Sequence, residues 1–187
     1  LRVARAALHH WEEPCLSGDP NAETGSGTVF FSGCTLKCCY CQNYPISQGE
    51  VGKAISVERL TEIFMNLQNG GAKNINLVTA SQYLPWVTAA LDAARAQGFS
   101  LPVVYNTGGY ETVDAVRALA GYVDIWLADY KYASLPWRKS FLPRRITHRW
   151  RTPPSAKCCC RPVPSVRCRQ LPAKRRDCAP TLPARPQ

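Results

Sequence analysis

Cys34, Cys38 and Cys41 are the residues of this chain whose type and spacing could do the most specific chemistry. Thiolates separated by three and then two residues on one short loop can hold three irons of an iron–sulfur cubane and leave the fourth iron open. A cluster that only carries electrons usually has four cysteine ligands, whereas an iron with an open position can bind a chelating small molecule. The spacing therefore favours a catalytic cluster.

The thiols could also hold a structural zinc ion or form disulfides. A structural zinc ion usually takes its ligands from two separated pairs, and no second pair lies near this loop, although Cys15 could supply an upstream ligand. Disulfides are disfavoured because nothing in the chain resembles a secretory signal, and a cytosolic chain keeps its thiols reduced. Cys39 follows Cys38 directly and cannot easily point at the same metal, so we interpret Cys39 as a packed bystander.

The segments around and after this loop alternate between strands and helices. Strands are predicted at 25–33, 75–79, 101–105 and 122–127, from runs of apolar and β-branched residues. Three helices are predicted between them. The first is capped by Ser56 and ended by Gly70 and Gly71, the second runs from Leu84 to Gln97 with Pro85 in its first turn and Gly98 as its stop, and the third runs from Val113 to Ala120 between Thr112 and Gly121. Such strands are parallel with right-handed crossovers, so the natural architectures are a doubly wound sheet or a barrel.

Polar residues follow each predicted strand at its carboxyl end, where ligands bind in both architectures. The first strand is followed by the cysteines, and the later ones by Thr79, Ser81, Asn106, Thr107, Asp129 and Lys131. Each of these is also an ordinary turn residue by itself. Because together they face a cysteine loop, they indicate a site.

Four other residues are interpreted as structural. His9 and His10 stand in a short segment where histidine commonly caps or packs. Trp86 and Trp126 fall on apolar faces of a predicted helix and strand, so we expect both to pack in the core.

The basic charge of the chain is confined to its end. The formal net charge is +10, yet residues 1–137 carry 9 Lys and Arg against 12 Asp and Glu, whereas residues 138–187 carry 14 against 1. That tail also holds nine prolines, five cysteines and no glycine, and it shows no strand or helix period. A basic tail can indicate nucleic-acid binding. We interpret the tail instead as a disordered segment or as the product of a shifted reading frame, because the change in composition near Leu135 is abrupt.

The residues resemble the radical S-adenosylmethionine (SAM) superfamily, whose signature is three cysteines at this spacing with an aromatic residue, here Tyr40, before the last. Within it, five segments look like proteins related to the pyruvate formate-lyase activating enzyme: 9–15, 25–34, 41–44, 105–111 and 124–131. The resemblance implies a partial parallel (β/α) barrel, a four-iron, four-sulfur cluster on Cys34, Cys38 and Cys41, and reductive cleavage of SAM to a 5′-deoxyadenosyl radical.

The resemblance also implies roles around the cofactor. Tyr40 lies where the adenine is approached, and Asp129 and Lys131 match a pair beside the cofactor. Thr79 and Ser81 fall where many members carry a glycine-glycine-glutamate motif for the methionine amine, and that motif is absent here. Asn106 is a further cofactor-binding candidate. The implied partners are a glycyl-radical enzyme as substrate and flavodoxin or ferredoxin as electron donor.

We therefore expect an α/β fold with three parts: a lead-in at 1–27, a truncated barrel with the cluster loop at 28–135, and the tail at 136–187. Truncation is expected because the chain begins with Leu1 and about four strands precede the tail, whereas the superfamily core has six strand–helix units. No apolar run reaches the ~20 residues that span a bilayer, so a cytoplasmic protein is expected. The alternatives are a radical SAM enzyme acting on a small molecule or RNA, and a non-catalytic iron–sulfur or zinc module.

Overall fold

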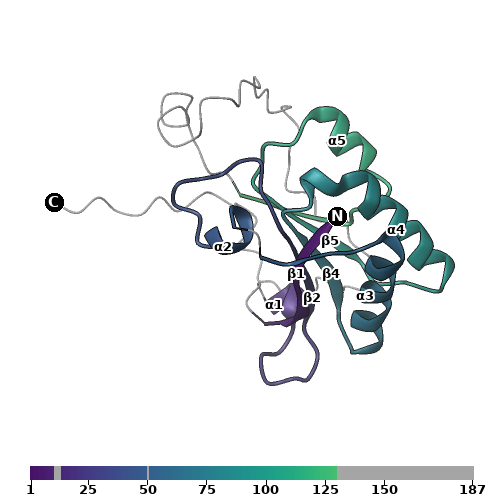
Figure 1. The fold of residues 1–187 in the computed structure, drawn as a ribbon. Helices are drawn as coiled ribbons and strands as arrows, with labels where there is room; N and C mark the ends of the chain where they lie inside the picture. The colour runs from purple at the N-terminus through teal and green to yellow at the C-terminus, as the bar shows by residue number, and fades with distance from the viewer. Residues whose placement is uncertain (11–13, 50, 130–187) are drawn as a thin grey trace, which may run out of the picture.

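The computed structural model describes residues 1–10, 14–49 and 51–129 of the 187-residue chain. These residues form one mixed sheet of six strands in the order β3-β1-β2-β4-β5-β6 (Figure 1). The strands are β1 (Arg2–His9), β2 (Ser26–Phe31), β3 (Lys53–Ala54), β4 (Asn74–Val78), β5 (Val103–Thr107) and β6 (Ile125–Ala128).

The half of the sheet from β2 to β6 is parallel, as the alternation of strands and helices predicts. Its four strands are in register, with Thr28 opposite Asn76, Asn76 opposite Val104, and Val104 opposite Ile125. The carboxyl ends of all four strands therefore meet at one edge of the sheet. This arrangement confirms the expected α/β fold with part of a parallel (β/α) barrel.

Two of the long connections are helices that begin at the predicted caps. Ser56 is the N-cap of α3 (Val57–Asn69), and Thr112 is the N-cap of α5 (Val113–Ala118). Each hydroxyl accepts a hydrogen bond of 3.2 Å from the backbone N–H three residues further on, which satisfies one of the free donors of a helix start. The helix α5 ends two residues before the predicted position 120.

The remaining long helix, α4 (Leu84–Ala96), has Pro85 in its first turn and is followed by Gly98. Gly98 has φ +93°, a left-handed conformation that favours glycine after a helix. The short elements are α1 (Pro14–Ser17), α2 (Tyr44–Ser47) and the 3-10 helix η1 (Ser81–Tyr83). None of the helices in the described part of the chain is long and apolar enough to cross a membrane.

The hydrophobic core lies between the sheet and the helices α3 and α4, which Figure 1 shows on one side of the sheet. Side chains alternate along a strand, so one set of positions faces these helices. That set is apolar and almost fully buried, and it includes Val29, Phe31, Ile75, Leu77, Val103 and Tyr105. The intervening positions of β2 and β4 carry the buried polar residues Ser26, Thr28, Asn74 and Asn76. The sheet thus has one apolar face and one partly polar face.

Trp86 does not pack in the core, and that expectation was wrong. The buried residues of α4 are Val87, Ala90, Leu91 and Ala94, and Trp86 stands just before this stripe. Its side chain is 46% exposed and contacts Tyr83 edge-on, with ring centroids 6.1 Å apart. Trp126 does pack against the core, with its ring 5.2 Å from that of Tyr105.

Residues near the amino terminus form a strand that the sequence analysis did not predict. β1 lies within the lead-in expected at 1–27 and pairs antiparallel with both β2 and β3. His9 is buried at the end of β1, and its ring meets Phe30 edge-on at 5.5 Å, in keeping with a structural role. Residues 130–135 and the expected tail at 136–187 lie outside the described residues.

Candidate functional site

The cysteine loop leaves the carboxyl end of β2 and folds back against α2. Gly33, at φ +77°, turns the chain out of the strand. Its N–H donates to the Ile46 carbonyl at 3.0 Å, and the next N–H, that of Cys34, donates to the Ser47 carbonyl at 2.8 Å. These two bonds fix the position of Cys34 relative to α2.

A second anchor ties the same loop to the end of β4. The Gln82 amide nitrogen donates to the carbonyls of Ser32, at 3.2 Å, and of Gly33. The Tyr83 hydroxyl also donates to the Ser32 carbonyl at 3.2 Å. Gln82 and Tyr83 lie on η1, the short helix that follows β4. The segment after β4 therefore holds the cysteine loop, which follows the neighbouring parallel strand β2.

The inner turn of the loop is packed rather than solvated. Leu36 and Cys38 are buried and form a small apolar cluster with Cys34, Cys41 and Tyr110. The Cys38 carbonyl accepts the Cys41 N–H at 3.2 Å, which closes the turn between these two cysteines. The Cys41 thiol lies 3.2 Å from the Ser47 hydroxyl.

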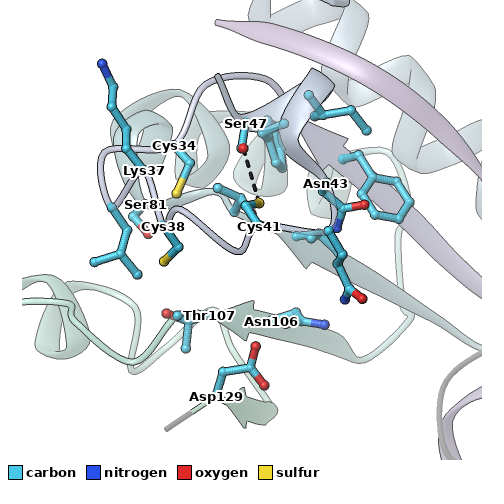
Figure 2. Close-up of a pocket in the computed structure, with 18 of the residues that line it drawn as sticks. Cys34, Lys37, Cys38, Cys41, Asn43, Ser47, Ser81, Asn106, Thr107 and Asp129 are labelled. Carbon is cyan, nitrogen blue, oxygen red and sulfur yellow. Dashed lines mark hydrogen bonds between the residues drawn. The ribbon is translucent and has the colours of Figure 1, made fainter. Parts of the chain in front are cut away.

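A cavity of about 700 Å³ opens between this loop and the carboxyl ends of the parallel strands. Figure 2 shows the loop cysteines on one side of it and Asn106, Thr107 and Asp129 on the other. Cys34, Cys38 and Cys41 all line the cavity. Cys39, which was interpreted as a bystander, and Cys15, the possible upstream ligand of a zinc ion, are both exposed and do not line the cavity.

The structure brings together nine of the ten residues that the sequence predicts for the site. Besides the three cysteines, the cavity wall includes Tyr40, Thr79, Ser81, Asn106, Thr107 and Asp129. Lys131 lies outside the described residues. The shared cavity supports the grouping of these residues, and their individual roles stay predictions.

Thr79 has an unusual backbone conformation for its residue type. Its φ is +61°, in the left-handed region that a β-branched residue rarely adopts. Its N–H donates to the Asn106 carbonyl at 3.3 Å, so the ends of β4 and β5 are held together where the chain leaves both strands. Strained conformations of this kind are concentrated at binding and catalytic sites.

Glu111 is a residue of the site that the sequence analysis missed. Its Oε1 accepts hydrogen bonds from the hydroxyls of Ser81, at 3.0 Å, and Thr107. The Tyr105 hydroxyl donates to Ser81 at 3.3 Å, and the Gly109 N–H donates to Thr107 at 3.1 Å. The signal that could have found Glu111 is its position, because it is the first carboxylate beyond the carboxyl end of β5.

Burial controls the ionisation of the groups around the cavity. It raises the pKa of the Cys34 thiol, and the neighbouring Cys38 and Cys41 raise it further, against the effect of hydrogen bonds with the backbone of Leu36 and Lys37. Burial is also the main reason that the pKa values of Tyr105 and Tyr110 are raised. A metal ion held by Cys34 would therefore have to displace a proton from the thiol.

The three thiols of the loop share one cavity. No three His, Cys, Asp or Glu side chains within the described ranges converge closely enough to hold one metal ion. In a cubane each cysteine ligates a different iron, so the three sulfurs surround a group instead of meeting at one point. Three cysteines on one wall of a cavity of about 700 Å³ suit that arrangement.

The chain is similar to a protein family and to a curated protein. A family model described as the radical SAM superfamily matches residues 28–128, which include the cysteine loop and the parallel strands. The uncharacterized protein MJ0674 of Methanocaldococcus jannaschii is 31% identical over 124 residues. The matched region covers 63% of this chain and 36% of that protein, so the chain spans little more than a third of the length of this curated relative.

Proposed function

Because this chain belongs to the radical S-adenosylmethionine superfamily, we propose that Cys34, Cys38 and Cys41 ligate a four-iron, four-sulfur cluster and that the protein cleaves SAM reductively. The observation that carries this proposal is the shared cavity. All three cysteines line it together with the polar ends of the parallel strands, whereas Cys15 and Cys39 are exposed outside it.

The chemistry divides between the cluster and the protein. When bound, the cluster supplies one electron to the sulfonium of SAM, whose S–C5′ bond breaks to give methionine and a 5′-deoxyadenosyl radical. Leu36 and the packed side of Cys38 keep water from the inner turn of the loop. Tyr40, which lines the cavity and is 51% exposed, offers an aromatic face for the adenine. Asn106 and Asp129 offer polar groups from the opposite wall.

The cleavage reaction is tested with the full chain, reconstituted anaerobically with iron and sulfide and then reduced. Methionine and 5′-deoxyadenosine should appear in equal amounts, as measured by liquid chromatography and mass spectrometry. The matched control is the Glu62→Gln variant on the exposed side of α3, which does not line the cavity and should cleave SAM at the same rate. A reconstituted, reduced protein that binds iron but forms neither product would contradict the proposal.

For the substrate of the radical we propose a glycine of a partner enzyme. The support is the resemblance of segments 105–111 and 124–131 to the activating enzymes of glycyl-radical enzymes. Adding a glycyl-radical enzyme from the same organism, with reduced flavodoxin or ferredoxin as the electron donor, should give a glycine-centred signal in electron paramagnetic resonance. Cleavage of SAM without this signal would leave the cleavage reaction standing and direct the search to a small molecule or RNA.

A further inference from the structure

The end of α2 is hydrogen-bonded to each of the three loop cysteines. The Ser47 carbonyl accepts the Cys34 N–H at 2.8 Å, and the amide nitrogen of the next residue, Gln48, donates to the Cys38 carbonyl at 3.2 Å. The Ser47 hydroxyl lies 3.2 Å from the Cys41 thiol (Figure 2). Of these three contacts, only the one between Ser47 and Cys41 reaches a sulfur atom.

The proton of the Ser47 hydroxyl has two acceptors within reach. The carbonyl oxygen of Tyr44 lies 3.4 Å away, well beyond the distance of about 2.7–2.8 Å that is usual between two oxygens. Sulfur is a larger atom than oxygen, so 3.2 Å between the hydroxyl and Cys41 Sγ is a close approach. A cysteine that ligates a metal has lost its own proton. With iron on Cys41, the hydroxyl is therefore the donor of this contact and the sulfur is its acceptor.

The surroundings of Ser47 strengthen this hydrogen bond. Its side chain is buried, so water competes little for the hydroxyl proton. A hydrogen bond to a charged acceptor, such as a thiolate, is also roughly twice as strong as one between neutral groups. Hydrogen bonds to the sulfurs are among the factors that set the potential of an iron–sulfur cluster, and they favour the state in which the sulfurs carry more negative charge. That state is the reduced one.

We infer that Ser47 is a positioning residue that donates its hydroxyl proton to the Cys41 thiolate and raises the reduction potential of the cluster held there. The inference rests on the proposed function, in which Cys41 is a cluster ligand. Ser47 acts through Cys41 in this account and does not touch SAM. The same residue fixes Cys34 through its backbone carbonyl, so a side-chain substitution removes the contact with Cys41 and leaves the contact with Cys34 in place.

The test measures the midpoint potential of the anaerobically reconstituted full chain without SAM. Titanium(III) citrate supplies the one electron that takes the cluster from its 2+ to its 1+ state, and electron paramagnetic resonance reports the reduced fraction. Ser47→Ala removes the hydroxyl. Ser26→Ala is the matched control, because Ser26 is also buried but donates its hydroxyl to Asn74 at 2.7 Å. A second pair, Ser47→Thr and Ser47→Val, compares side chains of nearly equal volume with and without a hydroxyl.

In Ser47→Ala the equilibrium constant for reduction should fall by about 10-fold, which lowers the potential of a one-electron couple by about 59 mV. Ser26→Ala should keep the potential of the unsubstituted protein, and Ser47→Thr should have a higher potential than Ser47→Val. An unchanged potential in Ser47→Ala, an equal shift in Ser26→Ala, or equal potentials in the second pair would overturn the inference and leave the proposed function standing.

The second pair decides the question where Ser47→Ala takes up too little iron for a titration. A cluster in Ser47→Thr with a lower potential, or no cluster, in Ser47→Val would support the inference. Loss of the cluster from both variants would overturn it, because the hydroxyl would then not be the group that matters. A reconstituted unsubstituted protein without the signal of a reduced four-iron cluster would overturn the proposed function as well.

Discussion

Replacing Gly109 by Ala should destabilise the protein and displace a wall of the cavity. Gly109 lies on the β5–α5 loop at φ +72°, and a Cβ added there would lie 2.6 Å from the carbonyl oxygen of Asp129. Asp129 follows β6 and lines the cavity. The substitution therefore combines backbone strain with a clash against the backbone of a residue that lines the cavity.

A matched variant separates the effect of backbone strain on stability from the effect of the clash with Asp129. Gly98 is also left-handed, at φ +93°, but a Cβ added there would have nothing within 4 Å. Gly98→Ala should therefore lower the free energy of unfolding by the strain alone, about 1–2 kcal/mol. Gly109→Ala adds overpacking of about 1–3 kcal/mol, so its total loss should be about 2–5 kcal/mol.

The measurement is urea unfolding followed by far-ultraviolet circular dichroism, together with SAM binding by calorimetry. Gly109→Ala should be the less stable variant and should bind SAM more weakly, because Asp129 has moved. Gly98→Ala should bind SAM like the unsubstituted protein. Equal losses of stability in the two variants, with equal SAM binding, would show that Gly109 does not pack against Asp129 as the structure describes.

Three further predictions concern the cavity, the core and the effect of pH. Asp129→Ala should weaken SAM binding in calorimetry while the iron content stays the same, and a loss of iron would show that Asp129 supports the cluster itself. Phe64→Ala removes a fully buried ring from the interface of α3 with the sheet, so it should cost about 3–5 kcal/mol in urea unfolding, and a loss below about 1 kcal/mol would contradict this packing. Burial, followed by nearby Arg5 and His10, lowers the pKa of His9, so the neutral form is favoured in the folded state. As the pH falls below about 6.5, the unfolded chain binds a proton at His9 more readily than the folded protein does, so the free energy of unfolding should decrease. The His9→Gln variant should show a flatter dependence of the free energy of unfolding on pH between about pH 7.5 and about pH 5.

The helices and parallel strands could be predicted because their signals are local. Ser56 and Thr112 cap their helices through residues three positions away, so the capping pattern is readable in the sequence itself. The grouping of the cysteines with the polar strand ends follows from one further rule, that parallel strands end at a shared edge. Thr79 and Asn106 meet there as expected.

The missed features depend on contacts between distant parts of the chain. β1 has exposed and half-buried residues in its middle, Arg5 among them, so its pattern does not alternate as a predicted strand should. Its conformation depends on pairing with β2. Glu111 has no local signal beyond its position, because it joins the site through a hydrogen bond from Ser81, which lies 30 residues earlier in the chain. Trp86 is exposed because it lies just outside the buried stripe of α4. The apolar character of the residue alone does not tell which side of the helix faces the core.

The central claim is that Cys34, Cys38 and Cys41 hold a catalytic cluster, and two adjacent residues test it most directly. Cys38 is 6% exposed and lines the cavity, whereas Cys39 is exposed and does not. The measurement is the iron content, the visible absorption and the SAM cleavage of anaerobically reconstituted Cys38→Ala and Cys39→Ala proteins. Cys38→Ala should lose the iron–sulfur absorption and the cleavage activity, and Cys39→Ala should keep both. Loss of the absorption in Cys39→Ala with its retention in Cys38→Ala would contradict this account.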